Sequence, residues 1–429
     1  MGSIANDDTS NLSPVTGIER LKAIQEIVEA RVATSTTDLR QVIKHIYDNP
    51  EIAFEEYIAH DTICKFLEDQ GFQVTRKAYA LDTAFEVLYG QGGRLISINA
   101  EYDALPGIGH GCGHHLIAAA SIAAFLGITA AIKKNNIEGR VQLLGCPAEE
   151  NQGGKAVLCK NGALKGVDAA VMAHPVPPYQ ISKNAIEDNV TAVGGCSSLA
   201  MLRWVVEFHG RASHAAACPH LGVNAFDAAV AAYNNVALLR QQIMDAERIH
   251  GCVLEGPTVP NTIGHYTKTV WIARSPTRGS LEALCKRVLA CFEAAALATG
   301  CTVKITEGNM YTDTLVTESL CNRYAEITNS IQGHNTIPFI HRVEPGSTDF
   351  GNVTYECPGI HAYYGVPCTS GVSVHHQTFT EATGTEESFY RSLKQGTMLA
   401  LTAWDLLTDD AFYKQVKAEW DVTVKKHSE

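Results

Sequence analysis

"RLISINAEYDALPGIGHGCGHHLIAAA", residues 94–120, contains the unit from which the rest of the fold follows. A short apolar run ends at acidic residues, a glycine-rich turn follows, and a long alanine-rich run begins at Leu116. This order predicts a buried strand followed by a helix that covers a sheet. The turn places Cys112 and His114 within three positions, and both residue types bind zinc-like metals. The alternative is a glycine turn with a helix-capping histidine and a buried thiol.

The same arrangement recurs downstream. "RVQLLGCPAEE" (140–150) and "VDAAVMAHP" (167–175) are short apolar runs that end in polar residues, with a helical stretch between them. Such alternation predicts a mostly parallel sheet with helices on both faces. Ligands of these sheets bind beyond the carboxyl ends of the strands. Here those ends carry Asp103, Glu149, Glu150 and His174.

A different order of strands and helices begins at Cys196. Strand, helix, strand, strand, helix and strand patterns succeed one another up to residue 307, which is the ferredoxin-like split β-α-β motif. We therefore predict an α/β fold: a mostly parallel-sheet domain with an inserted ferredoxin-like α+β domain. The predicted parts are a disordered lead-in (1–16), the larger domain (17–195 and 308–429) and the inserted domain (196–307).

Composition and charge limit the classes of molecule that the protein could bind. The 429-residue chain carries a formal net charge of −12 and has no Lys/Arg-rich run, which argues against nucleic-acid and anionic-membrane partners. The apolar span 116–132 follows a histidine cluster and predicts a buried core helix. The thirteen cysteines are an odd number without a framework, and the N-terminus lacks the pattern of a secretory signal. We expect reduced thiols and a cytoplasmic location.

The strand-end residues form a chemically coherent set. Histidine, carboxylate and thiolate together can hold two first-row metal ions. Adjacent Glu149 and Glu150 leave the chain in different directions, so one can bind metal while the other holds a water. A glutamate beside a metal-activated water is the general base of a metallohydrolase. The alternative for this pair is an exposed helix start, where glutamates complement the helix dipole.

Several motifs together resemble the aminoacylase/carboxypeptidase family of di-metal amidohydrolases. They are "NPEIAFEE", "AEYDALPGIGHGCGHHL", "GCPAEENQGGK", "MAHP", "GRASHAAACPHLGVNAFDA" and "GSTDFGN". Within the family they are similar to the branch of Xaa-Arg dipeptidase, aminobenzoyl-glutamate hydrolase and indole-acetyl-amino-acid hydrolase. The resemblance runs in order from about residue 45 to residue 390. It implies that the larger domain is a zinc-peptidase-like catalytic domain and that the inserted domain is a lid that also dimerises.

The resemblance implies a role for each matched residue. Cys112 would bridge two metals, with the remaining ligands His114, Glu150, His174 and His375. His375 is preferred to His376 because the family's ligand lies four residues before an aromatic, here Phe379. Glu149 would be the general base, and Asp103 would orient His114. The metals would be two divalent ions, zinc first, with manganese or cobalt as alternatives.

The lid residues implied by the resemblance concern the substrate. His214 would reach across a homodimer, formed through the lid, to stabilise the oxyanion in the partner's site. Asn261 and Arg274 match substrate-contacting positions, and arginine suits a free carboxylate. Gly346, Ser347 and Thr348 resemble a loop beside the substrate, although a plain turn fits them equally. The alternative for Arg274 is a solvated strand residue.

The expected function is metal-dependent hydrolysis of a dipeptide or N-acyl amino acid, a small-molecule amide. Three alternatives stay open: a non-catalytic metal-holding regulator, amide-bond formation by the same site, and a structural zinc site with redox-active thiols. One departure affects substrate choice. After His114 the family usually has aspartate or asparagine, whereas this chain has His115.

Overall fold

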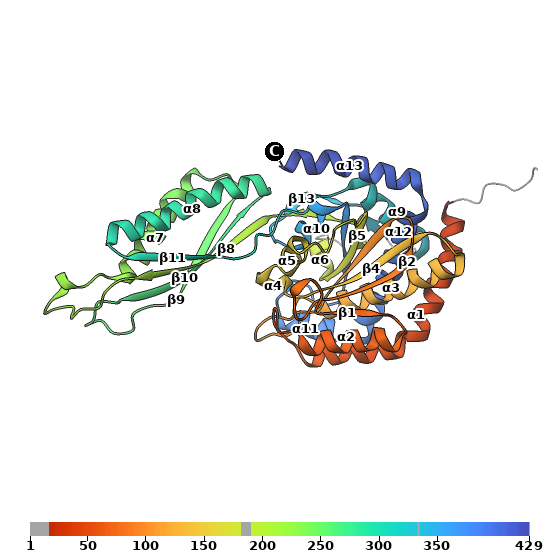
Figure 1. Cartoon of the computed structure of the whole chain (residues 1–429), viewed down its shortest axis with the longest axis horizontal. Coiled ribbons are helices and arrows are strands. Elements are labelled where there is room, and N and C mark those ends of the chain that lie inside the picture. The colour runs from red at the N-terminus through yellow and green to blue at the C-terminus, as the bar shows by residue number, and fades with distance from the viewer. Residues whose placement is uncertain (1–16, 182–189, 333–334, 429) are drawn as a thin grey trace, which may run out of the picture.

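The chain forms a larger domain around an eight-stranded sheet and a smaller domain that projects from it (Figure 1). The computed structural model describes residues 17–181, 190–332 and 335–428. The predicted lead-in, residues 1–16, lies outside the described residues. The chain enters the smaller domain and returns, so the larger domain is built from two segments.

The first segment of the larger domain alternates helices and strands. Its elements are α1 (Gly17–Asp48), α2 (Tyr57–Asp69), β1 (Val74–Arg76), β2 (Phe85–Gln91), β3 (Leu95–Glu101), α3 (His114–Asn135), β4 (Gly139–Cys146), α4 (Glu149–Gln152), α5 (Gly154–Lys160), β5 (Ala169–Val176), α6 (Pro178–Ile181), β6 (Val190–Val193) and β7 (Cys196–Ser198). The second segment comprises α9 (Glu318–Gln332), β12 (Asn335–Ile337), β13 (Ile340–Glu344), α10 (Phe350–Glu356), β14 (Gly359–Gly365), α11 (Gln377–Thr383), α12 (Glu386–Thr408) and α13 (Asp410–Ser428).

The large sheet is mixed, with a parallel centre. Its strand order is β1-β2-β4-β3-β5-β14-β6-β12. β3 pairs in parallel with β4 and β5, and β14 pairs in parallel with β5. β2 runs antiparallel to β4, and β6 runs antiparallel to β14. The predicted α/β fold is therefore confirmed, and the parallel strands bring their carboxyl ends to one edge.

Helix α3 lies at the centre of the core. It is long and apolar enough to cross a membrane, yet most of its residues are buried within the domain. It packs against α1, α12 and the sheet. Alanines at its contact points allow this close packing: a side chain at Gly396 of α12 would clash with the α3 backbone at Ala120.

The smaller domain is the ferredoxin-like lid. Its elements are β8 (Ala200–His209), α7 (Ala225–Leu239), β9 (Arg248–Glu255), β10 (Tyr266–Ser275), α8 (Arg278–Thr299) and β11 (Thr302–Glu307). The strands form an antiparallel sheet in the order β11-β8-β10-β9, and α7 and α8 cover one face of it (Figure 1). The predicted β-α-β-β-α-β order is thus confirmed. The lid sheet begins at Ala200, because residues 196–198 pair instead with β13 of the larger domain.

Candidate metal centre

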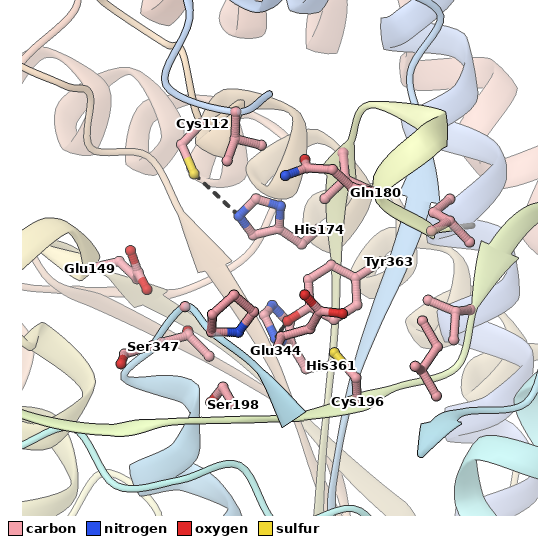
Figure 2. Close-up of a pocket in the computed structure, with 18 of the residues that line it drawn as sticks. Cys112, Glu149, His174, Gln180, Cys196, Ser198, Glu344, Ser347, His361 and Tyr363 are labelled. Atoms are coloured by element: carbon pink, nitrogen blue, oxygen red, sulfur yellow. Dashed lines mark hydrogen bonds between the residues drawn. The ribbon is translucent and has the colours of Figure 1, made fainter. Parts of the chain in front are cut away.

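The sheet edge and its loops enclose a pocket of about 290 Å³ in the larger domain (Figure 2). Cys112 comes from the glycine turn before α3, and Glu149 and Glu150 open α4 after β4. His174 lies near the end of β5, and His375 lies in the loop before α11. The pocket continues past these residues to Gln180, Cys196, Glu344, His361 and Tyr363.

The predicted ligands form two groups that share one thiol. The Sγ of Cys112 lies with one nitrogen of His114 and one of His174, all within 4.8 Å of one another. The same sulfur lies within this distance of Glu150 and His375. Cys112 Sγ is 3.4 Å from His174 Nε2, and Glu150 Oε1 is 3.0 Å from His375 Nε2. A thiol common to two ligand sets fits a pair of divalent ions.

Asp103 connects the two groups. Its Oδ1 is 2.8 Å from His114 Nδ1, and its Oδ2 accepts a hydrogen bond of 2.9 Å from the Glu150 backbone N–H. The contact with Asp103 would keep a proton on Nδ1 of His114, which leaves Nε2 as the nitrogen available to a metal. That nitrogen is buried and has no hydrogen-bond partner among the described residues. Such an orphaned nitrogen fits a metal ligand.

The electrostatics of the site are those of a centre that requires cations. Burial, and then the charges of Glu101 and Glu150, hold the pKa of Glu149 well above its ordinary value. Burial raises the pKa of the Cys112 thiol and lowers the pKa of His174 to about 4. A bound divalent ion would offset these costs by favouring the thiolate and the ionised carboxylates. The residues present therefore fit the metals that the resemblance implies.

Backbone strain marks the same residues. His375 has φ = 66°, a left-handed conformation that is uncommon outside glycine, and Ala148 before Glu149 has φ = 60°. The neighbouring His376 turns away and caps α11, its Nδ1 accepting a hydrogen bond from Thr378 N. Of the two histidines, only His375 contributes to the candidate ligand groups of the described chain.

A buried ion trio behind the pocket is absent from the sequence-based expectations. Lys155 Nζ contacts the Glu101 carboxylate and lies 2.7 Å from Asp349 Oδ1, and all three side chains are inaccessible to solvent. The other oxygen of Glu101 lies 3.4 Å from His114 Nε2. All three residues lie within motifs quoted for the resemblance, but the sequence assigned them no role. The partners are 54 and 194 residues apart along the chain.

Glu56 also has a structural role that the sequence did not indicate, although it ends the quoted motif "NPEIAFEE". Its Oε1 accepts hydrogen bonds from the backbone N–H groups of Phe54 and Ala148, and its Oε2 accepts one from Thr83. Burial raises its pKa to about 7. Glu56 thus anchors the strained residue that precedes Glu149.

The predicted substrate residues separate into two places. Gly346, Ser347 and Thr348 line the pocket. Arg274, at the end of β10 nearest the larger domain, donates a hydrogen bond of 2.6 Å to Ser347 Oγ and makes no ion pair within the described chain. Burial lowers the pKa of this guanidinium. An unpaired, half-buried arginine beside the pocket suits a substrate carboxylate.

His214 and Asn261 lie at the opposite end of the lid. His214 follows β8, whose ten residues span roughly 30 Å at about 3.4 Å per residue, and Asn261 lies between β9 and β10. The backbone of His214 bridges to Thr262, and both His214 and Asn261 are exposed and absent from the pocket lining. The His214 Nδ1 accepts hydrogen bonds from Ala216 N and Ala217 N, which leaves Nε2–H as the donor of this exposed ring.

His115 faces away from the pocket. Its ring packs against Tyr47 and His110, with centroid distances of 5.1 and 4.7 Å. Its Nε2 lies 3.1 Å from the carbonyl oxygen of Thr383. The departure from the family pattern therefore falls in the packing behind the metal site.

Comparison with known proteins identifies the family. No family model matches the chain. The chain is 35% identical over 416 residues to the Xaa-Arg dipeptidase of Mus musculus, with 93% of each chain covered, and 34% identical to the human enzyme, covering 89% of this chain and 88% of that one. It is also 28% identical to a p-aminobenzoyl-glutamate hydrolase chain of Escherichia coli, over 66% of this chain and 60% of that one.

Solved structures share the fold. An aminobenzoyl-glutamate utilization protein from Klebsiella pneumoniae matches with a TM-score of 0.69 at 15% identity, over 87% of this chain and 98% of that one. A dinuclear metal-binding peptidase of the M20 family from Bacillus subtilis matches with a TM-score of 0.57 at 18% identity, over 89% and 99%. The relatives of high coverage are hydrolases of amide bonds, and the chain is a metal-dependent amidohydrolase. It belongs to the M20 family of metallopeptidases and amidohydrolases.

Proposed function

We propose that this protein is a two-metal dipeptidase in which Cys112 lies between the ions. His114 and His174 would complete one ligand set, and Glu150 and His375 the other. Thiolate and imidazole ligands favour zinc, while a carboxylate ligand is also compatible with manganese or cobalt. Elemental analysis of protein purified without added metal salts tests both stoichiometry and identity.

Bound divalent ions would supply a Lewis acid for the amide carbonyl and would make a nearby water a stronger acid. Glu149 would take a proton from that water and deliver it to the leaving amine nitrogen. Its buried position beside the ligands supports this role, because burial raises the pKa of this carboxyl and makes the carboxylate a stronger base than a solvated glutamate. Asp103 would hold His114 in its ligating tautomer.

The substrate would be a dipeptide with a free carboxylate, or an N-acyl amino acid. Arg274 would pair with that carboxylate, and the loop 346–348 would line the path to it. Two relatives that cover most of this chain are named Xaa-Arg dipeptidases, which favours dipeptides with a basic second residue as the first substrates to test. The names of the relatives disfavour a non-catalytic regulator and a physiological direction of amide formation.

One observation carries the proposal. Glu149 is only 8% exposed and lines the pocket, and one of its carboxylate oxygens lies within 4.8 Å of potential ligand atoms of His114 and Glu150. The experiment is a mass-spectrometric screen of metal-loaded protein against dipeptides and N-acyl amino acids, with the metal-free protein as control. We expect hydrolysis that requires metal. A metal-loaded protein that cleaves nothing in a broad panel would refute the proposal.

We also propose a homodimer through the lid, in which His214 serves the partner's site. The outward face formed by α7 and β9 carries exposed Phe226, Val230, Tyr233 and Val253, and β9 is an edge strand of the lid sheet. An apolar face beside an open strand edge favours a protein interface. The length of β8 separates His214 from the pocket of its own chain, so its Nε2–H would serve a partner's site. Light scattering tests the oligomeric state.

We further propose a reducing, cytoplasmic setting. The thirteen cysteines all lie within the described residues, and none of them forms a disulfide. Reduced thiols in this number are typical of cytoplasmic proteins. Fractionation of cells that express a tagged chain tests the location.

A further inference from the structure

The turn that carries Glu149 is held by a residue of the segment that connects the lid back to the larger domain. Tyr311 follows β11, where the chain leaves the lid, and its side chain is 2% exposed. Its hydroxyl accepts a hydrogen bond of 2.8 Å from Gly153 N and donates one to the carbonyl oxygen of Glu149. One hydroxyl thus closes both ends of the turn 149–153.

The ring of Tyr311 fits this turn as closely as its hydroxyl does. A Cβ placed on Gly153 would lie 2.9 Å from the ring atom Cε1, and Gly153 has φ = 67°. Both observations require glycine at this position. Burial also holds the pKa of the phenol well above its ordinary value, so the hydroxyl keeps the proton that it donates.

The backbone of Tyr311 is tied to the lid at the same time. Its N–H donates to Met201 O at 2.9 Å, and its carbonyl accepts from Met201 N at 2.8 Å. Met201 is the second residue of β8, the strand by which the chain enters the lid. A single residue therefore connects the lid's entry strand to the turn of the candidate base.

The adjacent glutamates differ in how they are anchored. Glu150 has its own backbone anchor, because its N–H donates to Asp103 Oδ2. The Glu149 carbonyl is held by Tyr311, and nearby Asn309 holds Gln152 O with an exposed hydrogen bond of 2.6 Å. Loss of the Tyr311 hydroxyl would therefore disturb the base more than the ligand.

We propose that Tyr311 is a positioning residue that fixes the backbone of Glu149 and links it to the lid. This inference rests on the proposed function, in which Glu149 is the general base. A small misplacement of a reacting group can lower a rate on the order of 100-fold. Tyr311→Phe would leave Gly153 N and Glu149 O without partners in a buried site, and the turn would relax.

The test compares Tyr311→Phe with two variants. Tyr324→Phe removes another buried hydroxyl, bonded to Gln395 and distant in sequence from the site. Asn309→Ala removes the exposed bond to the same turn. For metal-loaded Tyr311→Phe we expect kcat to fall at least tenfold, with KM within twofold and both metals retained. Tyr324→Phe should keep kcat within twofold, and Asn309→Ala should lie between them.

A second measurement does not depend on activity. Deuterium uptake of metal-loaded protein in the segment 149–155 should rise in Tyr311→Phe and stay unchanged in Tyr324→Phe. If Tyr311→Phe matches Tyr324→Phe in kcat or in uptake, the inference is wrong. If its kcat falls because a metal is lost, Tyr311 supports a ligand and the inference is also wrong. A wild-type protein without hydrolytic activity would instead refute the proposed function.

Discussion

The metal centre and the tip of the lid are built in opposite ways. In the centre, Asp103 and Glu150 are held by several hydrogen bonds, and no candidate ligand except His375 is substantially exposed. At the lid tip, the side chain of His214 is exposed, and within the described chain its ring is bonded only by the nearby backbone of Ala216 and Ala217. Buried charges need fixed partners, whereas an exposed donor can await a surface that another chain supplies. The difference supports the two proposals made above, a rigid metal centre built from one chain and a lid tip that acts on a second copy.

The largest expected effect on turnover is that of Glu149→Gln. The amide keeps the shape of the side chain but cannot accept a proton, so kcat should fall by about 10²- to 10⁴-fold. Both metals should remain, because Cys112, His114, Glu150, His174 and His375 are unchanged. Steady-state kinetics with elemental analysis measures both quantities. A variant that kept a tenth of the wild-type rate would show that Glu149 is not the base.

Lys155→Met tests the rigidity of the centre through stability. Methionine removes the cation between Glu101 and Asp349, which leaves two carboxylates buried without their counter-charge. Breaking a buried ion network by removing one partner costs about 3–5 kcal/mol in the free energy of unfolding. Urea unfolding of wild type and variant measures this difference. The control is Lys65→Met: Lys65 is exposed and pairs with Asp69 four residues away, so the change should cost less than about 0.5 kcal/mol. Equal costs for the two variants would contradict the expectation.

Sequence patterns indicated the polar residues that gather at the sheet edge, but they did not indicate the buried residues that hold them in place. Histidine, cysteine and glutamate at strand ends are recognisable locally, and the alternation of strands and helices predicted the parallel sheet that brings them together. The trio of Lys155, Glu101 and Asp349 depends on contacts across the fold, which no local pattern records. The Tyr311 contact has the same character. Strands β2 and β7 were also missed, because β2 lies among turn residues and β7 has only three residues.

His214→Ala tests the lid tip directly. If His214 supplies an oxyanion donor, its loss should lower kcat by about 10²- to 10³-fold, with metals and fold intact. Mixing this variant with Glu149→Gln protein should form heterodimers in which one site has both residues, and activity should partly return. Mixtures that stay inactive despite demonstrated subunit exchange would exclude the cross-subunit role.

Val230→Asp tests whether the lid needs a partner at all. Val230 is 44% exposed on α7, so a charge there should leave the monomer folded while opposing apolar association. We expect the monomer mass by light scattering and at least a tenfold loss of turnover. The control is Leu297→Asp on α8, since Leu297 is 85% exposed and lies outside the proposed interface face. A monomeric Val230→Asp protein with full activity would show that each lid serves no partner.

The smallest effect should come from His115→Asn, which restores a residue usual for the family beside the ligand His114. The imidazole of His115 packs on Tyr47 and His110 and contacts Thr383 O, away from the pocket. Burial, and then the charge of nearby His110, holds its pKa well below the ordinary value, so the change removes no positive charge near the metals. Asparagine is smaller, and the loss of packing should cost about 1–3 kcal/mol in the free energy of unfolding. We therefore expect kcat/KM within threefold of wild type on every substrate tested, together with a lower Tm. A tenfold change in kcat/KM with an unchanged Tm would show that His115 acts on the substrate pocket. The residues that shape the metal centre would then include those packed behind the first turn of α3.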